Sequence, residues 1–77
     1  MSSFWKSTIN NCIANLKRAK RILQSDTLTK WKRKEIETYI KDTIKIMNWV
    51  CEDSKKDLRQ TMKKAGLQEL YSTYKPV

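Results

Sequence analysis

Apolar residues return every three or four positions along much of this 77-residue chain, and this spacing constrains the fold more than any other feature. In the first run the steps alternate between four and three, and its members are Trp5, Ile9, Cys12, Leu16, Ala19 and Leu23. Such a pattern places one apolar stripe along a helix of about 3.6 residues per turn. It predicts a first helix over about residues 3–24, with Ser2 or Ser3 as its N-terminal cap.

A second run of the same kind predicts a second helix over about residues 28–52. Its members are Trp31, Ile36, Ile40, Ile44, Met47 and Cys51. Residues 25–29 between the two runs carry short oxygen-bearing side chains, which end one helix and cap the next. A turn this short makes the two helices antiparallel, with the tip of the hairpin near Asp26.

Folding the chain about this tip places its two long helices side by side. Phe4 and Trp5 then lie beside Trp49 and Val50 at the open end of the hairpin. We expect these four side chains to form a buried aromatic cluster that contributes strongly to stability.

A third helix is predicted over about residues 55–65, because Ser54 and Asp57 have the spacing of a capping box. The alternative is that the second helix continues through a polar interval. Gly66 is well placed to end this helix, and residues 67–77 form a short tail with one more helical turn before Pro76. The predicted fold class is all-α.

So short a chain buries only a marginal core, and the hairpin presents more apolar surface than two helices cover. Two arrangements complete the bundle: the C-terminal segment folds back on the hairpin, or two chains associate. We expect a homodimer, with a monomeric three-helix bundle as the alternative.

The composition argues against catalysis, because the chain contains no histidine, the commonest general base and a frequent zinc ligand. We predict no catalytic residue, no metal and no cofactor, and we expect Glu35 and Glu37 to form surface ion pairs. Cys12 and Cys51 are predicted to be reduced and buried, as is typical of a cytoplasmic protein. No membrane span, signal peptide or lipid anchor is expected.

Charge is distributed very unevenly along the chain, whose formal net charge is +9. Between positions 17 and 34 the only acid is Asp26, and eight cations give this window a charge of +7. The eight are Lys17, Arg18, Lys20, Arg21, Lys30, Lys32, Arg33 and Lys34. The basic charge is therefore predicted to gather at the tip of the hairpin.

The two halves of this cluster have different explanations. Cations at the end of the first helix interact favourably with the dipole of that helix. Cations at the start of the second helix are repelled by the dipole of the second helix. The second half therefore indicates a site for phosphate oxygens, assisted by the hydroxyls of Thr27 and Thr29. We predict that Trp31, among these cations, covers the edge of the core, with stacking on a base as the alternative.

These features predict a non-enzymatic helical protein that binds nucleic acid or a phosphate-bearing nucleotide through the basic tip. The alternative is a protein–protein interaction module or inhibitor, of the kind that viruses and mobile elements encode, docking on an acidic protein. Adsorption to an anionic membrane is less well supported, because Trp5, Trp31 and Trp49 form no continuous lipid-facing surface opposite the cations.

Overall fold

The structure is a computed structural model that describes residues 2–75. In this part of the chain it contains four helices and no strand: α1 (Ser2–Leu23), α2 (Lys30–Asp53), α3 (Leu58–Lys64) and α4 (Gln68–Tyr74). The predicted all-α class is confirmed. The predicted cap at Ser2 or Ser3 involves side chains outside those described, and Pro76 lies outside the described residues.

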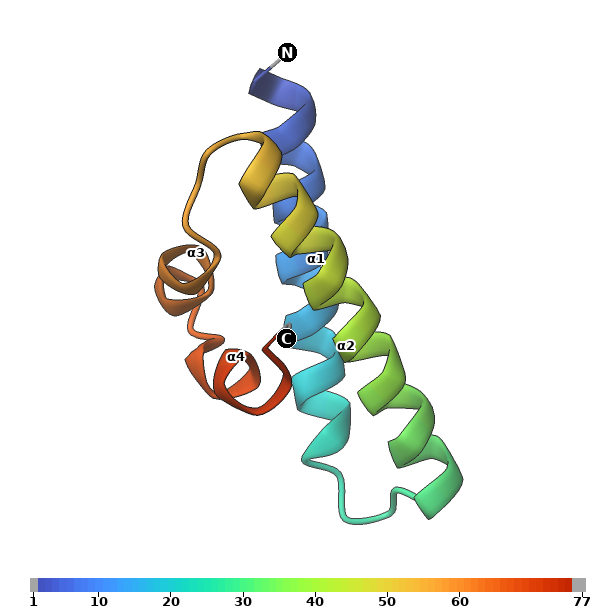
Figure 1. Ribbon diagram of the computed structural model, residues 1–77. Helices are drawn as coiled ribbons and strands as arrows, with labels where there is room; N and C mark the ends of the chain where they lie inside the picture. Colours follow the sequence, from blue (N-terminus) through green and yellow to red (C-terminus); the bar gives the residue numbers. More distant parts are fainter. Residues whose placement is uncertain (1, 76–77) are drawn as a thin grey trace.

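The two long helices form the predicted antiparallel hairpin (Figure 1). Helix α2 begins at Lys30 rather than at residue 28, because Thr29 is its N-cap. The Thr29 hydroxyl oxygen accepts a hydrogen bond from the backbone N–H of Lys32 at 3.2 Å. An oxygen-bearing side chain of the turn therefore caps the second helix, as the sequence predicted.

Residues 54–57 form a non-helical connection between α2 and α3, so the third helix is separate and does not continue α2. The predicted capping box is wrong. Asp57 is itself the N-cap of α3 and accepts from the backbone N–H of Gln60 at 3.3 Å, whereas Ser54 ends α2 and donates to the carbonyl of Val50. The roles differ because Lys55 adopts φ 59°, which reverses the chain before Asp57.

Helices α2 and α3 end in the same backbone motif, in which an N–H past the end reaches back to a carbonyl of the last turn. The Lys56 N–H donates to the Cys51 carbonyl at 2.7 Å, and the Leu67 N–H donates to the Met62 carbonyl at 2.8 Å. Each motif needs one residue in the left-handed region. After α3 this residue is Gly66 at φ 76°, as predicted, but after α2 it is Lys55.

The C-terminal segment is more ordered than the predicted short tail. Seven of its residues form α4, and Leu67 and Leu70 are buried in the main core. The prediction allowed one turn of helix here. The segment adopts more structure because its apolar side chains fill the space that the hairpin leaves beside Met62.

Helices α3 and α4 fold back together onto one side of the hairpin, where both contact α2 (Figure 1). A single cluster of buried residues joins all four helices. Its members are Ile9, Cys12, Leu16, Ala19, Ile36, Ile40, Ile44, Met47, Val50, Cys51, Leu58, Met62, Leu67 and Leu70. None of the helices in the described part is long and apolar enough to cross a membrane.

Two polar contacts tie the folded-back helices to the hairpin. The Tyr74 hydroxyl donates to Glu37 Oε2 at 3.0 Å, and Lys20 Nζ donates to the Gly66 carbonyl at 3.5 Å. The expectation that Glu37 forms a surface ion pair is therefore wrong, because the return of α4 brings a tyrosine hydroxyl to this carboxylate.

The aromatic cluster at the open end forms as predicted but is not buried. Phe4 and Trp5 have ring centroids 4.8 Å apart, and Trp5 and Trp49 have theirs 5.7 Å apart, both edge-on. Phe4 and Trp49 are exposed, and Trp5 is half-buried. The predicted burial is confirmed for Val50 and wrong for Phe4 and Trp49, because α3 and α4 cover the other side of the hairpin.

Candidate functional site

The basic residues gather where α1 ends and α2 begins, and this end of the hairpin projects beyond α3 and α4 (Figure 1). We call residues 17–34 the hairpin tip. Seven of its eight cations are exposed, and Lys20 is half-buried. Within residues 2–75 the one ion pair joins Lys32 Nζ to Glu35 Oε2 at 3.8 Å, with both side chains largely exposed. Most of the positive charge of the tip is therefore uncompensated.

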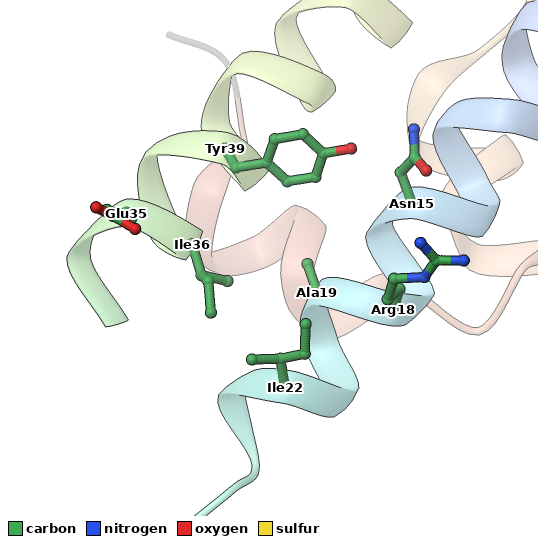
Figure 2. Close-up of a pocket in the computed structure, with 7 residues that line it drawn as sticks. All are labelled: Asn15, Arg18, Ala19, Ile22, Glu35, Ile36 and Tyr39. Carbon is green, nitrogen blue, oxygen red and sulfur yellow. The ribbon is translucent and has the colours of Figure 1, made fainter. Parts of the chain in front are cut away.

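The cations contributed by α1 face two directions. Lys17, Lys20 and Arg21 line a groove of about 300 Å³ between α1 and the turn from α3 to α4. Arg18 lines a separate groove between α1 and α2 (Figure 2). The structure thus brings three of the four together and places Arg18 apart from them.

The cations contributed by α2 also divide. Arg33 lies toward α4, where its charge acts on Tyr74 and lowers the pKa of that phenol. Burial, followed by the hydrogen bond to Glu37 and its charge, acts more strongly, so the pKa of Tyr74 is raised overall. Lys30 and Lys34 extend into solvent, and within the described residues their ammonium groups make no hydrogen bond or ion pair.

The hydroxyl groups predicted to assist phosphate binding are engaged within the chain. Thr29 caps α2, and the Thr27 hydroxyl lies 3.0 Å from the Ser25 hydroxyl. These contacts fix the turn and the first turn of α2. The exposed charge of the tip comes from the Lys and Arg side chains.

Trp31 is 83% exposed, so the prediction that it covers the edge of the core is wrong. The next apolar residue of the α2 stripe is Ile36, five positions later. Five positions correspond to about 140° around a helix, which turns the indole ring away from the buried side. That interval of five, where the stripe otherwise steps by three or four, was the sequence signal for exposure. Trp31 instead stands in solvent between Lys30 and Lys32.

The two thiols of the chain lie in the interior, outside the tip. Cys12 and Cys51 are buried and free, as predicted. Burial raises the pKa of both thiols, and the charge of Cys51 raises that of Cys12 further. Both are therefore protonated near neutral pH and react poorly as nucleophiles. Among residues 2–75 no group of His, Cys, Asp and Glu is arranged to hold a metal ion.

Comparison of the chain with protein-family models, characterised proteins and solved structures found no match. The chemistry of the tip is therefore inferred from the properties of its exposed side chains. Exposed Lys and Arg side chains attract polyanions. The indole ring of Trp31 exposes a flat apolar face to water, and such a face can stack on another ring.

Proposed function

We propose that this protein binds nucleic acid through the hairpin tip, and that Trp31 stacks on an unpaired base. Proteins that bind single strands combine cations that follow the phosphate backbone with aromatic rings that stack on bases. The tip offers both within the first turn of α2, where Lys30, Trp31 and Lys32 are consecutive and exposed. The role is binding without catalysis.

The exposed indole of Trp31 is the observation that carries this proposal. A basic surface that merely keeps a protein soluble does not require an apolar ring at its centre. An acidic protein partner would use the same cations, but the flat face of the ring suits a base especially well. Stacking of one base on an aromatic side chain contributes about 1–3 kcal/mol.

We also propose that the protein acts in a reducing compartment such as the cytoplasm. Support comes from Cys12 and Cys51, the only two cysteines of the chain, which are both free thiols inside the core.

Phosphate contacts at the tip predict a measurable salt dependence. If four to seven cations contact phosphates, the logarithm of the binding constant for a single strand should fall with the logarithm of salt concentration at a slope of about −3 to −5. Binding to a mononucleotide alone, with little dependence on salt, would instead favour the nucleotide as ligand, because a mononucleotide has no condensed counterions to release.

The test compares two variants with the same change in charge, using fluorescence anisotropy of a labelled single-stranded oligonucleotide. The tip variant replaces Lys30, Lys32, Arg33 and Lys34 by alanine. The matched control replaces Lys6, Lys41, Arg59 and Lys63, which are exposed and lie outside the tip. We expect the tip variant to bind at least tenfold more weakly than the control. Equal weakening of both would contradict binding at the tip.

A second pair of variants tests the role of the ring. Trp31→Ala should weaken binding by about tenfold, corresponding to ~1.4 kcal/mol. Trp31→Phe keeps an aromatic face at the same exposed position and should retain most of the binding. If the cations matter and Trp31 does not, the tip binds phosphate alone and the stacking proposal fails.

A further inference from the structure

The side of the hairpin away from α3 and α4 carries most of the exposed apolar surface of the molecule. We call this surface the open face and define it by Phe4, Ile22, Tyr39, Ile46 and Trp49, which are all exposed. Phe4 and Ile22 are five helical turns apart on α1 and so share one side of it. Tyr39, Ile46 and Trp49 follow one another at steps of seven and three on α2, which also places them on one side.

Contacts to the folded-back helices show that the open face is opposite to them. Glu37 binds Tyr74 of α4, and Tyr39 comes two positions later, about 200° around α2. Lys20 reaches the turn between α3 and α4, and Ile22 comes two positions later on α1. Figure 2 shows the resulting groove of about 380 Å³, in which Tyr39 extends from α2 toward Asn15 of α1.

The apolar area of this face matches that of a protein–protein interface of standard size. The exposed fractions are 63% for Phe4, 39% for Ile22, 47% for Tyr39, 51% for Ile46 and 61% for Trp49. With about 200 Å² for each fully exposed side chain, they amount to roughly 500 Å² of apolar surface. A specific interface of standard size buries about 800 Å² per partner, and at the apolar share of about 65% that is typical of homodimers the open face supplies its apolar area.

The charge of this face also suits a second copy of the chain. The groove beside Tyr39 is lined by one cation and one acid, Arg18 and Glu35. The groove beside Ile46 and Trp49 is likewise lined by Lys45 and Asp42. The face is therefore neutral, although the whole chain has a formal charge of +9. Two copies meet least repulsion here.

We infer that the open face binds a second copy of this chain, forming a homodimer in which the two hairpins run antiparallel. The orientation follows from the distribution of charge. Parallel hairpins would bring together two tips with a charge of +7 each between residues 17 and 34. Antiparallel hairpins place the tips at opposite ends, and residues 24–34 of each stay in solvent. This inference does not depend on what the tip binds.

The test is the mass of the full chain in solution, measured by light scattering over a range of concentrations. The wild type should reach the mass of a dimer. Ile46→Glu places a charge in the centre of the open face and should give a monomer with unchanged helix content by circular dichroism. Ser72→Glu adds the same charge on the exposed surface of α4 and should leave the dimer intact.

A second substitution guards against misfolding. If Ile46→Glu loses helix content, Phe4→Glu provides the same test at the other helix of the face. A wild type that stays monomeric at its highest soluble concentration overturns the inference, as does an Ile46→Glu or Phe4→Glu variant that folds and still dimerises.

Orientation is tested by a spin label on Ser25→Cys, an exposed position at the tip, while Cys12 and Cys51 remain buried. In antiparallel dimers the two labels should be separated by a distance comparable to the 41 Å length of the molecule. Labels close together would show parallel hairpins and would overturn the proposed arrangement.

Discussion

The two long helices form both the hairpin tip and, together with α3 and α4, the rest of the molecule, which we call the body. The two regions differ in whether α3 and α4 cover the hairpin. In the body α3 and α4 complete the core, and Met47, Met62 and Leu67 are almost inaccessible to solvent. Of residues 24–34 at the tip, only Leu28 is not exposed. Residue choice in the body is therefore limited by packing. At the tip packing imposes no such limit, and there the chain carries Lys, Arg and Trp31.

Truncating one large side chain in each region should change the free energy of unfolding by very different amounts. Met62→Ala leaves a cavity where α3 meets the core and should lower the free energy of unfolding by about 2–5 kcal/mol. Trp31→Ala removes a larger side chain from the tip and should change it by no more than about 0.5 kcal/mol. Urea unfolding measures both values. A Trp31→Ala variant as unstable as Met62→Ala would show that the ring is packed.

The next effect concerns the two chain reversals that hold α3 in place. Gly66→Ala puts a Cβ at φ 76° and should lower the free energy of unfolding by about 1–2 kcal/mol. Lys55→Gly should raise it by about 0.5–1 kcal/mol, because Lys55 already occupies the left-handed region at φ 59°. Thermal unfolding of the two variants checks the opposite signs. Destabilisation by Lys55→Gly would contradict the reversal at this residue.

A smaller effect is expected where the body meets the tip, at the hydrogen bond between Tyr74 and Glu37. Tyr74→Phe removes it and should cost about 1 kcal/mol near neutral pH. The pKa of Tyr74 is raised above its ordinary value of 10.0 in the folded protein. The protonated phenol therefore stabilises the fold fully below pH 10. This stabilisation is lost as the pH rises through the folded-state pKa.

Urea unfolding from neutral pH to about pH 11 should therefore show a decline in the wild type that is smaller in Tyr74→Phe. Equal declines in the two proteins would mean that the phenol is not held by Glu37. A comparison with Tyr71→Phe separates this contact from the general ionisation of tyrosines.

Local periodicity accounts for the parts of the fold that the sequence predicted correctly. The stripes of α1 and α2, the capping of α2 within the turn and the role of Gly66 all depend on residues a few positions apart. The start of α3 was misassigned because Ser54 and Asp57 each suit a cap, and the left-handed conformation of Lys55 decides between them. Nothing in the type of residue 55 indicates this conformation.

The candidate site was predictable in its charge but not in its geometry. Eight clustered cations are visible in the sequence, whereas the separation of Arg18 from Lys17, Lys20 and Arg21 depends on where the α3–α4 turn meets α1. The pairing of Glu37 with Tyr74 spans 37 residues. Such long-range contacts depend on the lengths and directions of the helices, which a local pattern does not specify.

Chemical-shift mapping tests the proposed binding of nucleic acid by the cations of the tip and Trp31 residue by residue. In ¹⁵N-labelled protein titrated with a short single-stranded oligonucleotide, the indole N–H of Trp31 and the amides of Lys30, Lys32 and Lys34 should shift most. The indole N–H of Trp49 should stay in place. A titration in which the Trp31 indole does not move, or in which the largest shifts fall outside residues 17–34, would contradict nucleic-acid binding at the tip.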